Sequence, residues 1–203
     1  MRYEFLIDTY RTEIEKVLSV WAMFEDADLR LRPHPSDARG RNLLEHMVHQ
    51  NASEHLWFSR MLGIAVTADP VPAEETRVAF MNAYAENALR RLSALQAKDE
   101  SWWEEEADFF EVRRSRAWIM TRRIAHTAHH RGQQMALLRM FNRDIHSNYG
   151  PTADTGGLMQ NNAPVIYAYP NLDAILADEK GGARRKADLP GPGDKPPTER
   201  PGT

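Results

Sequence analysis

Apolar side chains recur every three or four residues in long segments of this chain, and that spacing is what most constrains its fold. An α-helix turns once in 3.6 residues, so such a stripe lies along one helix face and must pack against another element. The first segment predicts a helix over about residues 3–25. Its stripe consists of Leu6, Tyr10, Ile14, Val17, Trp21 and Phe24.

The second and third segments also carry signals for helix ends. Asn42 is a suitable N-cap for a helix that runs to Leu62 and stops at Gly63, because asparagine accepts hydrogen bonds from the free N–H groups of a first turn. Residues 72–75, Pro-Ala-Glu-Glu, suit the start of a third helix that continues to Leu95. Proline has no N–H to leave unpaired, and acidic groups favour the positive end of the helix dipole.

Ser115 is a candidate N-cap for a fourth helix, which we expect to reach about Asn142. The preceding stretch, residues 101–110, is aromatic and acidic and has no helical period, so two short extended pieces and a packed loop are equally suitable interpretations. Residues 172–177 could form one short helix. Four helices with longish connections predict an all-α bundle with an irregular C-terminal extension.

Chain length and composition predict one domain over residues 1–178. A chain of 203 residues is too short for two ordinary domains. Glycine, proline and charged residues dominate from Lys180 onward. Such a segment buries too little apolar surface to offset its ordering entropy, so we expect residues 179–203 to form a disordered tail.

Charge and cysteine content exclude several classes of function. The formal net charge of −3 and the lack of a wide basic face with stacking aromatics argue against a nucleic-acid partner. Cysteine is absent, which excludes disulfides, thiolate metal sites and a cysteine nucleophile. We expect no membrane partner, because no run approaches the roughly 20 apolar residues of a span and no apolar signal region opens the chain. A cytoplasmic protein is the resulting expectation.

Two histidines four residues apart are the main chemical signal. His126 and His130 lie one helical turn apart and point the same way. They supply two neutral nitrogen donors, and a third ligand must come from another helix, where the second helix offers His46, His49 and His55. The competing interpretation is a solvated helix face. His129 lies on a neighbouring face.

The run from His126 to Gln133, followed by Leu137-Leu138-Arg139, resembles the signature of the DinB/YfiT-like superfamily. The resemblance covers about residues 3–142, and the run Tyr149-Gly150-Pro151 resembles part of one branch. It implies an up-down-down-up four-helix bundle that holds a divalent metal through three histidines, one from the second helix and two from the last. (The superfamily is unrelated to the translesion DNA polymerase that shares its name.)

The resemblance implies the ligand set His49, His126 and His130. His46 stays open as the alternative to His49, because the apolar stripe places it nearer the buried side. His46 also stands where the family usually has an aliphatic residue. The register that favours His49 rests on Asn42, Glu54, Trp57 and the closing Met61-Leu62-Gly63.

The resemblance also implies a reaction class. Similar proteins include transferases that use bacillithiol or mycothiol and a mycothiol-dependent maleylpyruvate isomerase. We therefore expect a metal-dependent S-transferase or hydrolase that acts on a small molecule, such as a low-molecular-weight thiol, with zinc or nickel as the metal ahead of manganese or iron. The alternative is a non-catalytic metal-binding or structural stress-response bundle. A homodimer is expected, and no catalytic residue is assigned.

The remaining polar residues can be explained without a role in metal binding. Gln133 could orient a ligand histidine or simply hydrogen-bond within the bundle. Glu45 and Glu54 could support the site, but carboxylates on a helix surface are usually solvated. For the arginines near the start of the fourth helix we expect salt bridges to the preceding acidic segment. They are Arg113, Arg114, Arg116, Arg122 and Arg123.

Overall fold

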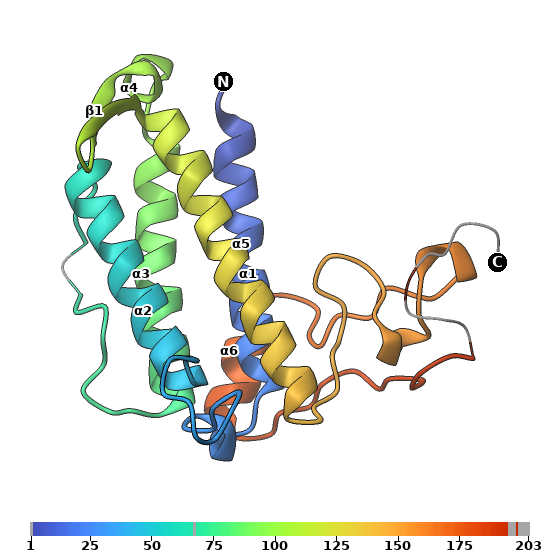
Figure 1. Cartoon of the computed structure of the whole chain (residues 1–203). Helices are drawn as coiled ribbons and strands as arrows, with labels where there is room; N and C mark the ends of the chain where they lie inside the picture. The colour runs from blue at the N-terminus through green and yellow to red at the C-terminus, as the bar shows by residue number, and fades with distance from the viewer. Residues whose placement is uncertain (1, 67, 195–197, 199–203) are drawn as a thin grey trace.

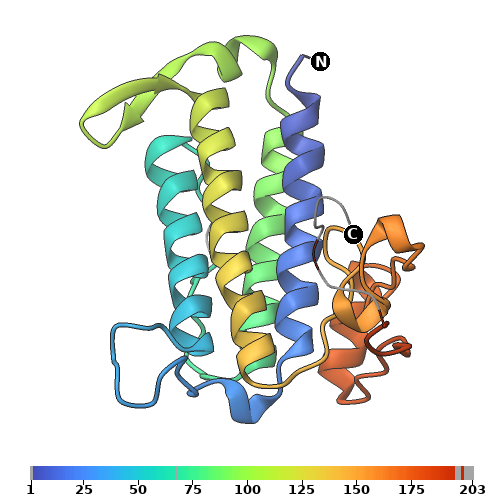
Figure 2. The same cartoon turned by 45° about the vertical axis from the view of Figure 1, so that its right-hand side comes forward.

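Four long helices lie side by side in the structure, a computed structural model that describes residues 2–66, 68–194 and 198 (Figure 1). The helix α1 packs against α3 and α5, and α2 also packs against both. Figures 1 and 2 show α1 and α5 running in one direction and α2 and α3 in the other. The long helices are α1 (Glu4–Met23), α2 (Leu43–Leu56), α3 (Arg77–Gln96) and α5 (Arg116–Met140).

The apolar stripe predicted along α1 is buried, as expected. Tyr10, Val17 and Trp21 are each at most 2% exposed. Trp21 packs on Tyr84 of α3 with ring centroids 5.1 Å apart, which links the first and third helices through their aromatic side chains. One face of α1 therefore supplies the centre of the core.

Both predicted ends of the second helix are confirmed. The Asn42 side chain accepts from Glu45 N at 2.9 Å, and the Glu45 carboxylate accepts from Asn42 N at 3.0 Å, which is a capping box. The helix continues as one π-helical stretch, η2 (Trp57–Met61). Gly63 then adopts φ +66°, a left-handed conformation that favours glycine.

The third helix begins later than its sequence predicted. The structure starts α3 at Arg77, where the Thr76 hydroxyl accepts from Ala79 N at 3.2 Å, and residues 72–75 remain in a loop. Figure 1 shows the reason. The chain leaves the upper end of α2 and returns along the length of the molecule before α3 starts, so these residues are needed as connection rather than as helix.

The stretch before α5 contains a short helix and a hairpin, so the all-α expectation is incomplete. The helix α4 (Glu100–Glu104) is capped by Asp99, and strand β1 (Glu106–Phe109) pairs antiparallel with β2 (Val112–Ser115). The hairpin agrees with the extended alternative. The five residues of α4 are too few to show a helical period. Ser115 caps α5 as predicted, accepting from Trp118 N at 3.3 Å.

Part of the segment expected to be disordered packs against the long helices. The Arg184 guanidinium donates to the carbonyl oxygens of Ala22, at 3.0 Å, and Phe24, at 2.6 Å. These acceptors lie at the C-terminal end of α1, where carbonyl groups have no partner within the helix. Ala187 N also donates to Ala168 O at 3.0 Å. Residues 195–197 and 199–203 of the expected tail lie outside the described residues.

The other short elements are η1 (Asp26–Asp28), η3 (Ala153–Thr155), η4 (Met159–Asn161) and α6 (Leu172–Gly181). The helix α6, predicted as a short helix from Leu172, packs against α1 and α3. None of the described helices combines the length and the apolar character that a membrane span requires.

Candidate metal centre

Three histidines from two helices meet between α2 and α5. His49 of α2 and His126 and His130 of α5 each offer one nitrogen within 4.8 Å of the other two. The ring centroid of His130 lies 4.6 Å from that of His49 and 4.6 Å from that of His126. Because α2 and α5 pack directly, one turn of α5 presents both of its rings to the single ring on α2.

His46 lies one turn before His49 and outside this set. It is 4% exposed, and its ring centroid is 5.7 Å from that of His130. Of the other candidates, His55 is half-buried and joins no such group in the described part of the chain. His129 is on a neighbouring face of α5, as expected. The structure therefore brings together the three histidines that the resemblance implied.

The surroundings of all three rings favour the neutral form, which is the form that binds a metal. Burial lowers the pKa of His49 to about 4, and the positive charge of Arg41 adds to the effect. Burial and the nearby Arg123 lower the pKa of His126 to about 3. Burial also lowers the pKa of His130, although a hydrogen bond to a glutamine opposes the shift.

That glutamine is Gln133, and it orients His130. The distance from Gln133 Oε1 to His130 Nδ1 is 2.9 Å. Amide oxygen only accepts, so Nδ1 carries the proton and Nε2 of His130 is left as a lone-pair donor. This contact is compatible with both roles considered for Gln133, because it is a hydrogen bond within the bundle that also fixes the ring of a candidate ligand. His126 Nδ1 is buried with no partner among the described residues.

The chemistry of this donor set fits a divalent transition metal. Three neutral imidazole nitrogens suit zinc, nickel, copper or iron, whereas calcium and magnesium prefer oxygen. Within the described ranges, no carboxylate joins the three histidines in a common ligand group. His49, His126 and His130 are thus the residues that could hold such an ion.

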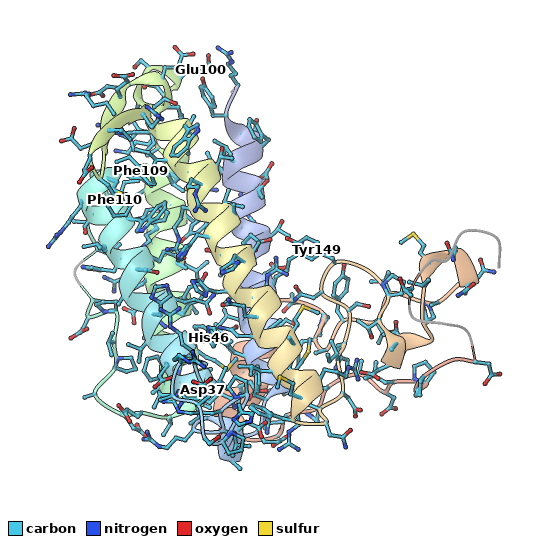
Figure 3. All side chains as sticks on the ribbon, viewed as in Figure 1. Asp37, His46, Glu100, Phe109, Phe110 and Tyr149 are labelled. Atoms are coloured by element: carbon cyan, nitrogen blue, oxygen red, sulfur yellow. The ribbon has the colours of Figure 1, made fainter. Side chains whose placement is uncertain are left out.

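An aromatic wall stands beside His126. The Trp57 ring stacks on His126 at 5.6 Å with an interplanar angle of 30°. Phe109 and Phe110 of the hairpin contact Trp57 at 5.2 Å and 6.2 Å, and Figure 3 shows both phenylalanines at the upper end of α2. This wall shields one side of the histidine cluster from water.

Glu54 is one residue that the sequence interpretation placed wrongly. It is fully buried, not solvated, and its carboxylate accepts from Tyr10 Oη at 2.5 Å, Arg91 Nη1 at 3.1 Å and Arg123 Nη2 at 3.4 Å. Burial and the Glu54 charge raise the pKa values of Tyr10 and Tyr84 well above the ordinary value of 10. Glu54 thus ties four helices together just above the histidines.

A second buried ion pair fixes α5 directly after the last histidine. Arg131 Nη2 donates to both carboxylate oxygens of Glu13, at 3.1 and 2.9 Å, and to Tyr149 Oη at 2.6 Å. Arg131 also donates to the side chain of Asn148. The Tyr149 run noticed in the sequence therefore packs on the same arginine that follows His130, although Figure 3 shows it on the opposite side of α5 from His46.

Polar residues within an apolar stripe were the signal for these networks. On α2, Gln50 and Glu54 fall at three- and four-residue steps between Met47 and Phe58, and all four are fully buried. Gln50 accepts from the side chain of Gln134 on α5. A polar residue at such a position must find a buried partner, because an unpaired one is costly.

The arginines of α5 divide into two groups. Arg116 pairs with Glu105 at 2.5 Å and Arg113, just before the helix, pairs with Glu106 at 3.5 Å, which are the expected salt bridges to the acidic segment. Arg123 differs from that expectation. It is buried and pairs with Glu54.

Comparisons with known proteins agree with this fold. The DinB family profile matches residues 9–150. The crystal structure of a DinB-like protein from Bacillus cereus ATCC 10987 superimposes with a TM-score of 0.62 at 18% identity, covering 70% of this chain and 94% of that chain. At this identity the likeness shows the fold alone. No curated protein sequence matches the chain. The family match covers well over half of the chain and includes all three histidines, so the chain belongs to the DinB family.

Proposed function

We propose that the protein binds a divalent metal, zinc or nickel ahead of manganese or iron, through His49, His126 and His130, and uses it in a reaction on a small molecule. The observation that carries this proposal is the size of the ligand set. Catalytic zinc sites typically have three protein ligands and one open position, whereas structural sites have four. The described part of the chain brings three such residues together.

The reaction we favour is transfer of a low-molecular-weight thiol, with hydrolysis as the other reaction of the same site. A divalent ion held here supplies a Lewis acid that lowers the pKa of a thiol or water. The chain's own residues keep the rings neutral by burial, orient His130 through Gln133, and exclude water on the Trp57 side. The chain has no cysteine, so a sulfur nucleophile would come from the co-substrate.

Zinc affinity, measured by competition with a chromophoric chelator, tests the ligand set. Structural zinc sites with four protein ligands bind zinc with an apparent free energy of about 10–16 kcal/mol, which corresponds to about 3 kcal/mol for each ligand. We therefore expect His49→Ala to weaken zinc binding by about 100-fold. His46→Leu is the matched control, since it lies one turn earlier on the same helix, and we expect it to change zinc affinity less than about threefold. The opposite pattern would show that His46 is the ligand.

Turnover is tested separately. The metal-loaded protein is incubated with a thiol and monochlorobimane, and conjugate formation is compared between wild type and His49→Ala. We expect conjugation that depends on His49. Metal binding without conjugation of any low-molecular-weight thiol, and without hydrolysis, would support the non-catalytic stress-response alternative.

Two further assignments belong to this proposal. The directions of the long helices in Figures 1 and 2 support an up-down-down-up four-helix bundle. The homodimer remains a prediction, and sedimentation velocity at two protein concentrations tests it.

A further inference from the structure

A cavity of about 430 Å³ adjoins the histidine cluster at the lower end of α2 and α5. Its wall includes Arg39 and Arg41 from the loop before α2, His46 from α2, and Gln133 from α5. Figure 3 places His46 and Asp37 in this lower part of the molecule. Gln133 contacts His130, so one side chain of the cavity wall reaches a candidate ligand.

Arg41 is an exposed cation in this wall, and its charge acts on the Glu45 carboxylate, which is itself paired with Arg32. In the described residues no carboxylate lies within ion-pair distance of Arg41, whereas its neighbour Arg39 is held by Asp37 at 2.7 Å. The charge of Arg41 reaches His46, His49 and His130, since it contributes to the lowered pKa of each. The guanidinium is therefore near enough to act on the cluster, and its exposed N–H groups are open to solvent or to a ligand.

His46 adds a buried imidazole to the same wall. The side chain is 4% exposed, and its Nδ1 has no hydrogen-bond partner among the described residues. That nitrogen is itself shielded from solvent, so it is another part of the His46 side chain that lines the cavity. His46 is not a member of the candidate ligand set.

The nearby carboxylates are already neutralised. Glu45 pairs with Arg32 at 2.5 Å, and Glu54 pairs with Arg91 and Arg123. The three candidate ligands are neutral, so they would leave the charge of a bound divalent ion uncompensated. The cavity thus places the exposed Arg41 guanidinium beside a site of positive potential, and none of its described lining residues is an anion.

From these observations we infer that the cavity binds an anionic group of the substrate, a carboxylate or a phosphate. Arg41 donates N–H groups to its oxygens, and His46 lines the same wall. Guanidinium is suited to this task because its fork of donors matches two oxygens at once. The inference rests on the proposed function for the role of the neighbouring metal, but the anion site itself exists without metal.

The first test uses the full-length, metal-free, isotope-labelled protein in NMR titrations. Propionate, methyl phosphate and the neutral propionamide are added, and the Nε–Hε signal of Arg41 is followed. We expect saturable shifts with at least one anion, which also identifies the preferred group, and none with propionamide. Equal responses to propionate and propionamide, or no response to either anion, would overturn the inference.

Two charge-removing variants make the titration specific. Arg41→Gln should weaken anion binding about tenfold, monitored at the backbone amide of Gln133, because a charge-assisted pair is lost. Arg122→Gln is the matched control. Arg122 is exposed on α5 and close enough to lower the pKa of His126, but it does not line the cavity. Equal weakening in both variants would show a general electrostatic effect and contradict the inference.

A calorimetric comparison separates this inference from the proposed function. Zinc-loaded protein is titrated with 3-mercaptopropionate and with its neutral analogue 3-mercaptopropionamide. We expect about a tenfold preference for the acid, lost in Arg41→Gln and kept in Arg122→Gln. Equal affinities would overturn the anion site and leave the metal proposal standing. Failure to bind zinc would overturn the metal proposal, and the metal-free titrations would still decide the anion site.

Discussion

Neutralising one buried carboxylate should destabilise the whole protein. In the variant Glu54→Gln the side chain keeps its size but loses the charge that faces Arg91 and Arg123. Both arginine side chains are 1% exposed, and Glu54 is the single carboxylate within ion-pair distance of either among the described residues. The substitution therefore leaves two buried guanidinium groups without a counter-ion.

The magnitude follows from the contacts. Breaking a buried ion pair by removing one partner costs about 3–5 kcal/mol. The amide oxygen that the substitution introduces can still accept from Tyr10 Oη, a bond worth about 1 kcal/mol. We therefore expect a loss of about 3 kcal/mol in the free energy of unfolding. For a chain of this size that corresponds to a fall in Tm of about 6–12 °C.

Urea unfolding of the metal-free protein at pH 7 measures this loss. Glu86→Gln is the control, since it breaks an exposed pair with Arg90 and should cost less than about 0.5 kcal/mol. Adding Arg91→Met to Glu54→Gln should recover part of the loss, because one unpaired charge is removed. A cost below about 1 kcal/mol for Glu54→Gln, or no coupling in the double variant, would refute the reasoning.

Three further outcomes are expected. Gln133→Leu should weaken zinc binding about 10- to 100-fold, because the side chain that orients His130 is lost, and it should change Tm little, because that side chain is exposed. Chelator competition measures the zinc affinity, and an unchanged affinity would contradict the orienting role. Burial lowers the pKa of His146, although the hydrogen bond from His146 Nε2–H to Ala187 O opposes the shift. The stability that neutral His146 contributes is therefore complete above the unfolded pKa of about 6.5 and is lost as pH falls through the folded pKa. His146→Gln should therefore lose less stability than wild type between about pH 7.5 and pH 5, by at most about 2 kcal/mol, and parallel pH profiles of Tm would disprove this. Ser115→Ala should cost about 1 kcal/mol by removing the N-cap of α5, and an unchanged urea midpoint would show that the cap is dispensable.

Local patterns in the sequence were enough to predict the long helices and two of the three candidate ligands. The stripe on α1, the cap at Asn42 and the cap at Ser115 act within one helical turn, so they can be recognised without knowledge of the rest of the chain. The spacing of His126 and His130 is equally local. Their shared face follows from helix geometry alone.

Other features depend on contacts between distant segments, and only the tertiary structure decided them. Whether His46 or His49 joins the pair on α5 depends on how α2 is rotated against α5, and two residues three apart differ by less than one helical turn. The start of α3 depends on the distance that the preceding loop must cover. The environment of Glu54 depends on arginines 37 and 69 residues away in the sequence. Local pattern determines which face of a helix is available, but the packing of helices against one another determines what that face meets.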